Sequence, residues 1–272
     1  MSDDPLFSLT GKVVLVTGGL GQIGASLTRA MLARGARVAV IEAPGATLAG
    51  SRLKAYADNS DFRLENADVT DRGSVEAALA AIVDDWGTPA GLVNAAGLDS
   101  PPGAPLEENG PFETYPEASW DKVMAVNVKG VMLCCQVIGG AMADDGGGSI
   151  VNVASTYGLV SPDQSLYEYR RQRGETFYKP VAYSASKSAL YNLTRYLATY
   201  WAPRGVRVNT LTPGGVFNGQ DEDFLEGYAR RAPMGRMARE TEYDGAVVVM
   251  LSDASTYMTG ANLVVDGGWT AW

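Results

Sequence analysis

The sequence contains no histidine among its 272 residues. This absence excludes a Ser–His–Asp triad, a zinc site built on imidazole and an imidazole general base. Only two cysteines occur, and because Cys134 and Cys135 are adjacent, neither a disulfide framework nor a cysteine zinc cluster is expected. We therefore expect no bound metal. Any proton transfer has to use a carboxylate, a lysine, a tyrosine or water.

An excess of positive charge is also missing. The chain has 22 Lys and Arg against 31 Asp and Glu, a net charge of −9, which argues against binding to a nucleic-acid backbone. The first residues are acidic and lack the basic and apolar layout of a signal peptide, and we expect no stretch to approach a membrane span. These absences predict a soluble, cytoplasmic protein with no nucleic-acid or membrane partner.

Short apolar runs alternate with longer segments of helical periodicity along the chain. The expected strands are 12–17, 37–41, 61–66, 91–94, 148–154, 206–210 and 262–266. The expected helices are 23–34, 46–57 (the weakest), 71–86, 117–142 and 181–201. Buried strands that alternate with helices indicate βαβ units and a parallel sheet. The pattern predicts one α/β domain over residues 1–272, a Rossmann-type doubly wound parallel sheet of about seven strands flanked by helices.

A glycine-rich turn, Thr17-Gly-Gly-Leu-Gly-Gln-Ile-Gly24, joins the first expected strand to the first helix. Such a turn brings backbone amides and a helix N-terminus against a pyrophosphate. Alone, the motif would also fit a merely flexible loop, but its position directly after a buried strand favours a dinucleotide site. The expected cofactor contacts in this turn are Gly18, Gly21, Gln22, Ile23 and Gly24.

Acidic residues follow the second and third expected strands. Glu42 ends the second strand, where a carboxylate can accept both ribose hydroxyls of adenosine and would repel a 2′-phosphate. We therefore expect NAD to be preferred over NADP, although a solvated loop acid is the alternative reading. Asp68 and Val69 come after the third strand, in a position to receive the adenine amino group.

Tyr183 and Lys187 lie four residues apart in an expected helix, so the phenol and the ammonium project from one face. A neighbouring cation stabilises a phenolate and is expected to lower the pKa of Tyr183. An ordinary amphipathic helix would carry the same pair. Ser155 ends a strand at the edge where ligands bind in open α/β sheets. Asn127 is either a satisfied core amide or part of a buried relay.

In these motifs the chain resembles the short-chain dehydrogenase/reductase family over about residues 9–268. The matching motifs are the glycine turn, Asp68-Val69, Asn94-Ala95-Ala96-Gly97, Asn127, Ser155, Tyr183-x-x-x-Lys187 and Pro213-Gly214. The resemblance implies that Tyr183 is the acid–base, that Ser155 hydrogen-bonds the substrate oxygen, and that Lys187 binds the nicotinamide ribose and lowers the phenol pKa. It also implies that Asn127 supports a water linking Lys187 to solvent.

The resemblance further implies cofactor contacts at Asn94, Ala95, Ala96, Gly97, Tyr183, Lys187, Pro213, Gly214 and Val216. It implies a homotetramer or homodimer with helix 181–201 in an interface. The activity it implies is a hydride transfer between a nicotinamide and an alcohol or ketone carbon.

Two segments depart from the family pattern or vary within it. Ser155 and Tyr183 are 28 positions apart, about twice the usual separation, so residues 156–180 form an insertion beside the substrate pocket. The insertion carries the cations Arg170, Arg171, Arg173 and Lys179. We hypothesise that one or more of them contacts an anionic or polyhydroxylated substrate, such as a sugar acid. The expected substrate contacts are Ser155, Tyr157, Arg170, Arg173 and Tyr183. A solvated face or a subunit contact is the alternative. Residues 214–237 correspond to the family's mobile lid, and Trp269 and Trp272 are candidates to line a pocket.

The sequence thus predicts an NAD-dependent oxidoreductase that interconverts a secondary alcohol and a ketone on a small sugar, polyol or sugar acid. A 3-ketoacyl or small-carbonyl reductase is the alternative within the enzymes, and a preference for NADP would favour it. A non-catalytic nucleotide-binding scaffold is the alternative from another class. Such proteins tend to lose the serine, tyrosine or lysine, and all three are present here.

Overall fold

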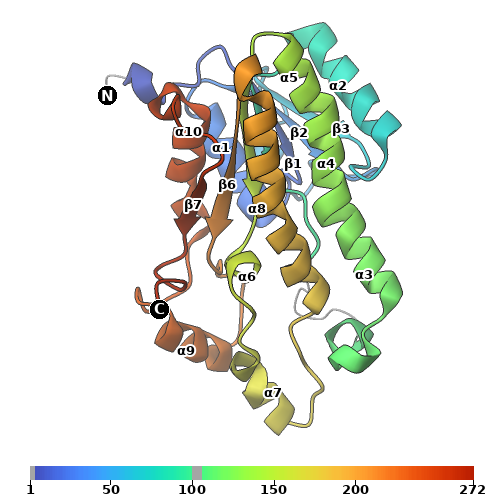
Figure 1. Cartoon of the computed structure of the whole chain (residues 1–272), viewed down its shortest axis with the longest axis vertical. Coiled ribbons are helices and arrows are strands. Elements are labelled where there is room, and N and C mark those ends of the chain that lie inside the picture. Colours follow the sequence, from blue (N-terminus) through green and yellow to red (C-terminus); the bar gives the residue numbers. More distant parts are fainter. Residues whose placement is uncertain (1–3, 100–105) are drawn as a thin grey trace.

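Seven parallel strands form one sheet at the centre of the molecule (Figure 1). The structure is a computed structural model that describes residues 4–99 and 106–272. The spatial order is β3-β2-β1-β4-β5-β6-β7, so the direction of the winding reverses between β1 and β4, the switch point at which open α/β sheets bind ligands. The strands are β1 (Val13–Thr17), β2 (Arg37–Glu42), β3 (Phe62–Asn66), β4 (Gly91–Asn94), β5 (Gly148–Val153), β6 (Val206–Pro213) and β7 (Asn262–Val265).

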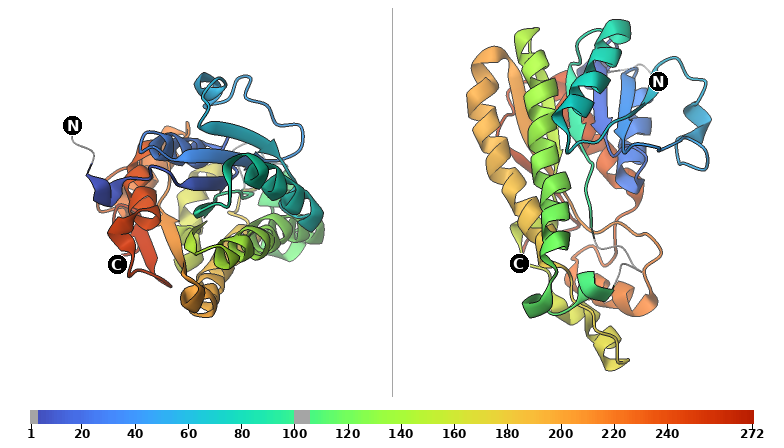
Figure 2. Two further views of the ribbon diagram at one scale, coloured as in Figure 1. Left: turned by 90° about the horizontal axis from the view of Figure 1, so that it is seen from above. Right: turned by 90° about the vertical axis from the view of Figure 1, so that its right-hand side faces the viewer.

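Helices cover both faces of the sheet, which explains why β1 and β4 are buried at every position. One face packs against α2 (Arg72–Trp86), α8 (Val181–Trp201) and the long helix that contains α3 to α5. Figure 2 shows α8 and this long helix running side by side. The other face packs against α1 (Gln22–Leu32) and α10 (Asp244–Leu251). The expected seven-stranded, doubly wound parallel sheet is confirmed.

The long helix consists of α3 (Glu117–Met124), α4 (Val131–Cys134) and α5 (Gly140–Asp144), joined by two π-helical segments, Ala125–Gly130 and Cys135–Gly139. By length and composition this helix could cross a membrane, which corrects the expectation that no stretch approaches a span. Half of its apolar window is buried inside the fold, as in the core helix of a globular protein. Cys134 and Cys135 lie in this core as free thiols, and burial raises the pKa of Cys134 to about 12.

The insertion and the lid have their own regular structure, at the end of the molecule opposite α5 (Figure 1). The insertion contains α6 (Thr156–Leu159), a 3-10 turn at Gln164–Tyr167 and α7 (Glu168–Gln172), and the lid contains α9 (Glu222–Arg231). Their apolar side chains form a third hydrophobic core, separate from the two sheet faces. Its buried members are Leu166, Tyr167, Phe177, Tyr228, Ala232 and Met237, together with Trp269 from the C-terminal segment.

The expectation of a helix at residues 46–57 is wrong. This segment contains only a 3-10 turn at Lys54–Tyr56, because Gly45 and Gly50 adopt positive φ angles of 85° and 75° that interrupt a helix. The apolar spacing instead reflects burial of Leu53 against the sheet. The other 3-10 helices are Pro5–Phe7, Leu106–Asn109, Phe112–Thr114, Ala202–Arg204, Glu240–Tyr243 and Asp253–Ser255.

Candidate active site

A cavity of about 850 Å³ opens at the carboxyl ends of the strands. Its wall is built from the glycine turn, the segments that follow β4, β5 and β6, the start of α8, the insertion and the lid. The expected site residues that line it are Gly18, Gly21, Gln22, Ile23, Gly24, Ala95, Gly97, Ser155, Tyr157, Arg170, Tyr183, Lys187, Pro213, Gly214 and Val216. The topology therefore brings the glycine turn and the Ser–Tyr–Lys group to the same space.

The glycine turn is packed so tightly that a side chain would meet neighbouring backbone atoms at two positions and the Val40 side chain at a third, Gly19. Gly18 has a φ of 67°, and a Cβ there would lie 2.6 Å from the Cα of Ala96. A Cβ on Gly24 would lie 2.3 Å from the carbonyl oxygen of Gly18. Helix α1 begins after Gly21, and no side chain caps its first-turn amides. Uncapped amides at a helix N-terminus without a Cβ in front of them fit a dinucleotide pyrophosphate.

Glu42 supports this turn directly, because its carboxylate accepts a hydrogen bond from the Leu20 amide at 3.1 Å. Asp68 accepts two hydrogen bonds from Thr70, at 2.8 Å from the amide and 2.7 Å from the hydroxyl, and these bonds lower the pKa of Asp68. The side chain of Val69 packs against Gly130 of the long helix. Glu42, Asp68 and Val69 do not border the cavity, so their contacts to adenosine stay predictions.

Asn94 and Ala96 also lie behind the cavity wall rather than in it. The buried side-chain amide of Asn94 donates to Asn152 Oδ1 at 2.9 Å and thereby links β4 to β5. The hydroxyl of Thr17 accepts hydrogen bonds from the amides of Ala95 and Ala96, at 3.2 and 3.1 Å. Thr17, which we did not predict as a site residue, therefore fixes the segment after β4 against the glycine turn.

Ser155, Tyr183 and Lys187 meet at one side of the cavity. Ser155 lies two residues after the end of β5 and caps α6 by accepting a hydrogen bond from the Tyr157 amide at 3.2 Å. Tyr183 and Lys187 both lie in the first two turns of α8, as their spacing predicts. The Lys187 ammonium donates to the Val153 carbonyl at 2.8 Å and lies 5.9 Å from the centroid of the Tyr183 ring.

The direction of the Tyr183 pKa shift differs from the expectation. Burial raises the pKa of Tyr183, the negative charge of Asp99 raises it further, and a hydrogen bond with Ser155 lowers it. Burial also lowers the pKa of Lys187 to about 8.

Asn127 is fully buried in the π-helical segment Ala125–Gly130, and its side chain clamps the backbone of Leu98. Its Oδ1 accepts from the Leu98 amide at 2.7 Å, and its Nδ2 donates to the Leu98 carbonyl and to Ser186 Oγ, both at 2.9 Å. Of the two readings, the satisfied core amide is observed, and the water relay stays a prediction. Gly97, the residue before Leu98, lies beside the lysine, since a Cβ there would lie 3.3 Å from Lys187 Nζ. By binding Leu98, Asn127 therefore holds this stretch of backbone next to Lys187.

The insertion and the lid give the cavity an aromatic wall. Trp269 stacks on Tyr228, with ring centroids 4.5 Å apart and an interplanar angle of 22°. Of the two C-terminal tryptophans expected to line a pocket, Trp269 lines the cavity of its own chain, whereas Trp272 is 79% exposed. The aromatic wall comprises Tyr157, Tyr167, Tyr169, Phe177, Phe224, Tyr228 and Trp269.

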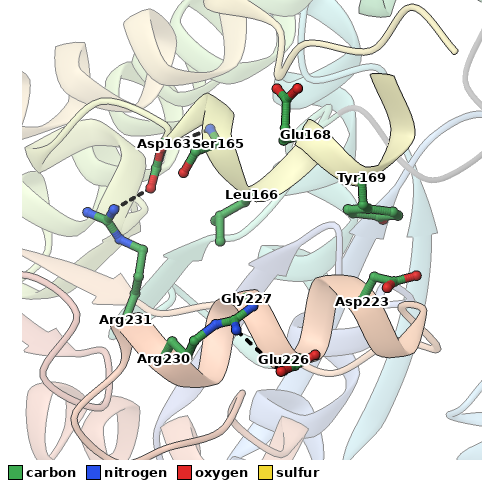
Figure 3. A pocket seen from close by; sticks show the side chains of 10 residues that line it. All are labelled: Asp163, Ser165, Leu166, Glu168, Tyr169, Asp223, Glu226, Gly227, Arg230 and Arg231. Carbon is green, nitrogen blue, oxygen red and sulfur yellow. Dashed lines mark hydrogen bonds and ion pairs between the residues drawn. The ribbon is translucent and has the colours of Figure 1, made fainter. Parts of the chain in front are cut away.

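The outer side of the insertion and the lid forms a second, smaller groove of about 360 Å³ (Figure 3). Figure 3 shows α7 and α9 facing each other across this groove, with Arg231 reaching from α9 to pair with Asp163. At the other end, the Tyr169 hydroxyl donates to Asp221 at 2.6 Å. The insertion and the lid are thus joined by an ion pair at one end of the groove and by a hydrogen bond at the other.

The cations of the insertion are placed differently from the hypothesis. Arg173 lies outside the cavity and pairs with Asp223 of α9, contrary to the expectation that it contacts substrate. Arg170 does line the cavity, with its guanidinium 3.9 Å above the Phe177 ring and paired with Glu175 at 2.6 Å. Lys179, another of the four cations in the hypothesis, also lines the cavity, and it pairs with Asp99.

Comparisons with known proteins agree with this geometry. Residues 18–270 match the sequence pattern of a family described as Enoyl-(Acyl carrier protein) reductase. D-threitol dehydrogenase of Mycolicibacterium smegmatis is 36% identical over 280 aligned residues, which cover 99% of this chain and 97% of that protein.

Two solved structures are similar over almost the whole chain. The first is a short chain dehydrogenase of Leptospira borgpetersenii with bound NAD+, with a TM-score of 0.82 and 32% identity, covering 97% of this chain and 94% of that one. The second is a gluconate 5-dehydrogenase of Burkholderia cenocepacia in complex with NADP and tartrate, with a TM-score of 0.83 and 27% identity, covering 98% of each chain. With its parallel sheet, its glycine turn and its converging Ser155, Tyr183 and Lys187, the chain belongs to the short-chain dehydrogenase/reductase family of NAD(P)-dependent oxidoreductases.

Proposed function

We propose that this protein is an NAD-dependent dehydrogenase that interconverts a secondary alcohol and a ketone of a polyol, sugar or sugar-acid substrate. The observation that carries the proposal is the convergence of Ser155, Tyr183 and Lys187 on one cavity that also contains the glycine turn. A bound nicotinamide supplies the acceptor for the hydride. The remaining chemistry is a single proton transfer at the substrate oxygen.

The side chains divide this proton chemistry between them. Ser155 and Tyr183 line the same cavity, so we propose that their hydroxyl groups hold one substrate oxygen between them. During oxidation Tyr183 first has to lose its own phenolic proton, and the resulting phenolate then accepts the proton of the substrate hydroxyl. During reduction the neutral phenol donates its proton to the substrate oxygen. Lys187, whose pKa is lowered to about 8 by burial, is a cation that can release its proton near neutral pH. We further propose that its ammonium binds the nicotinamide ribose, as the family resemblance implies.

The proposed preference for NAD rests on Glu42. Its carboxylate lies at the end of β2 and is oriented toward the glycine turn by the hydrogen bond from Leu20. A 2′-phosphate placed there would face this carboxylate, whereas two ribose hydroxyls would donate to it. Arg37 lies at the opposite end of β2 and pairs with Asp61, so it cannot neutralise Glu42.

The proposed substrate class follows from the mixed lining of the cavity. The aromatic wall offers flat faces to the C–H groups of a sugar chain. Polar groups stand among these rings, including the Lys179 ammonium and the phenols of Tyr157 and Tyr167. The similarity to a D-threitol dehydrogenase and a gluconate 5-dehydrogenase supports a polyhydroxylated substrate. The cations Arg170 and Lys179 add a reason to include sugar acids.

The alternatives make different demands on the cavity. A 3-ketoacyl or small-carbonyl reductase is favoured by the description of the matching family and would act with NADPH on an apolar chain. A non-catalytic scaffold has no need of Ser155, Tyr183 and Lys187 around one cavity, and all three are there.

The experiment that tests this function follows the reduction of NAD and of NADP by absorbance. The panel contains four- to six-carbon polyols, sugar acids and a 3-hydroxyacyl thioester. We expect turnover with at least one polyol or sugar acid, and a higher kcat/KM with NAD. Glu42→Gln should narrow that difference in kcat/KM by roughly tenfold, the value of about one charged hydrogen bond. Turnover confined to the thioester with NADPH would favour the ketoacyl reductase, and binding of both nucleotides without any turnover would favour the scaffold.

We also infer a cytoplasmic homotetramer or homodimer with α8 in an interface. On α8, Tyr196 and Tyr200 are 64% and 58% exposed and stack on each other with ring centroids 6.1 Å apart. Such exposed aromatic side chains are typical of protein interfaces. Light scattering at micromolar concentration measures the mass, and a mass of 28.7 kDa, that of one chain, would contradict the inference.

A further inference from the structure

Tyr183 lies within reach of two ammonium groups, and only one of them belongs to the family motif. Lys187 is inside the fold and donates to the carbonyl of Val153. Lys179 comes from the insertion and lies 5.0 Å from the centroid of the Tyr183 ring, closer than the 5.9 Å of Lys187. The Lys179 side chain lines the cavity and is 9% exposed. A nearly buried cation thus faces the phenol from the substrate side.

The backbone of Lys179 is fixed by a side chain from the other end of the insertion. Gln164 Oε1 accepts from the Lys179 amide at 2.9 Å, and Gln164 Nε2 donates to the Lys179 carbonyl at 3.2 Å. The backbone N–H and C=O of Lys179 are therefore both satisfied by one side-chain amide, in the way that a neighbouring strand would satisfy them. The insertion consequently delivers the ammonium to a defined place.

Asp99 supplies the opposite charge. Its carboxylate forms an ion pair with Lys179, and both side chains line the cavity. Among the influences on Tyr183, only burial exceeds the negative charge of Asp99, which raises the pKa of the phenol. Asp99 also acts on Lys187, whose pKa it raises against the effect of burial. One carboxylate therefore affects both groups of the catalytic pair, and Lys179 stands beside it as a counter-charge.

We propose that the Asp99–Lys179 pair is a positioning element that sets the pH range in which Tyr183 accepts the substrate proton. Lys179 offsets the charge of Asp99, so the phenol meets a nearly neutral pair instead of an isolated anion. This inference rests on the proposed role of Tyr183 as the acid–base. The ionisable groups that line the same cavity are Asp99, Arg170, Lys179, Lys187 and Asp221, with the phenols of Tyr157, Tyr167, Tyr169, Tyr183 and Tyr228.

The test is the pH profile of kcat/KM for alcohol oxidation, whose acidic limb reports the group that must lose a proton. Lys179→Met removes the cation that pairs with Asp99, so the apparent pKa of this limb should rise by about 1 unit. Asp99→Asn removes the anion, so the apparent pKa should fall by a similar amount, about 1 unit. The double variant should return to within roughly half a unit of the wild-type value, because both charges are gone.

Two controls separate charge from structure. Lys179→Arg keeps the charge and should restore the wild-type profile. The chain also has a matched Lys–Asp ion pair remote from the cavity. Lys12, which directly precedes β1 at the amino ends of the strands, lies 2.9 Å from Asp253. Lys12→Met and Asp253→Asn should leave the pH profile unchanged.

The inference is overturned if Lys179→Met changes only the KM for the substrate while the acidic limb stays in place. It is equally overturned if Lys179→Arg shifts the limb as much as Lys179→Met does. If Lys179→Met does not fold, the Asp99→Asn variant decides alone. A downward shift in the apparent pKa of the acidic limb then supports the inference, and an unshifted limb overturns it. A Tyr183→Phe variant keeps the two proposals apart. Wild-type turnover by that variant would refute the proposed function, whereas an inactive Tyr183→Phe with unshifted profiles for the pair would refute only this inference.

Discussion

Replacement of Gly24 by alanine is the sharpest perturbation of the proposed cofactor site. The added Cβ would lie 2.3 Å from the carbonyl oxygen of Gly18 and 2.8 Å from the Cα of Gly19. Both neighbours are backbone atoms of the same turn, so no side chain can rotate away. Restoring an ordinary contact of 3.4 Å requires the start of α1 to move away from the turn by about 1 Å.

This displacement should affect stability and binding together. Overpacking of this kind costs about 1–3 kcal/mol, which corresponds to a drop in melting temperature of about 2–12 °C for a chain of this size. The same movement withdraws the first-turn amides from the pyrophosphate. The loss of one charge-assisted hydrogen bond, about 1.5–3 kcal/mol, weakens dinucleotide binding by roughly 10- to 100-fold.

The assays are the thermal midpoint without ligand and the Kd for NADH from fluorescence titration. Gly140→Ala is the matched control, because a Cβ at this helical glycine meets no atom within 4 Å. It should raise stability by about 0.5–1 kcal/mol and leave the Kd for NADH unchanged. A Gly24→Ala variant that melts and binds NADH like the wild type would refute the assignment of this turn to the dinucleotide.

Two further predictions concern Lys187 and Trp269. Burial lowers the pKa of Lys187 from 10.5 to about 8, so the unfolded chain binds more protons between these pH values and wild-type stability should rise with pH across that window. Lys187→Met should therefore be about 2 kcal/mol more stable than the wild type at pH 7, a figure that already allows for the loss of one hydrogen bond, and this advantage should disappear above pH 10. Denaturant titrations at both pH values measure the free energy of unfolding, and a variant less stable than the wild type at pH 7 would contradict the prediction. Trp269→Ala removes a buried ring that stacks on Tyr228 and should cost about 3 kcal/mol. It should also raise the KM for the alcohol more than the KM for NAD, and equal changes in both KM values in steady-state kinetics would argue against its place in the substrate wall.

Much of the fold could be predicted because its strands are buried on both faces. A strand such as β1, with five buried positions in a row, appears in the sequence as an unbroken apolar run that ends in glycines. The same logic located Ser155 and Tyr183, since the end of a parallel strand and the start of the following helix meet at one edge of the sheet. The prediction of a helix at residues 46–57 was wrong because their apolar spacing reflects the burial of Leu53 and not a helix face.

The substrate side of the cavity could not be predicted, because long-range contacts determine it. Nothing near Lys179 in the sequence shows that Gln164 binds its backbone or that Asp99 pairs with it. The direction of the Tyr183 pKa shift was likewise inaccessible, since the i,i+4 spacing reveals the nearby lysine but not the burial of the phenol. Arg173 resembled a substrate ligand by composition alone, and its partner Asp223 lies 50 residues away in the lid.

The turnover number of a Tyr183→Phe variant, at saturating NAD and alcohol, tests the central claim most directly. The substitution removes the phenolic oxygen and with it at most one hydrogen bond to the cofactor, so the Kd for NADH should rise by no more than about tenfold. The proposed proton transfer predicts a fall in turnover of roughly 10²- to 10⁴-fold, the usual contribution of a general acid–base. A variant that binds NADH normally and retains turnover within tenfold of the wild type would contradict the account.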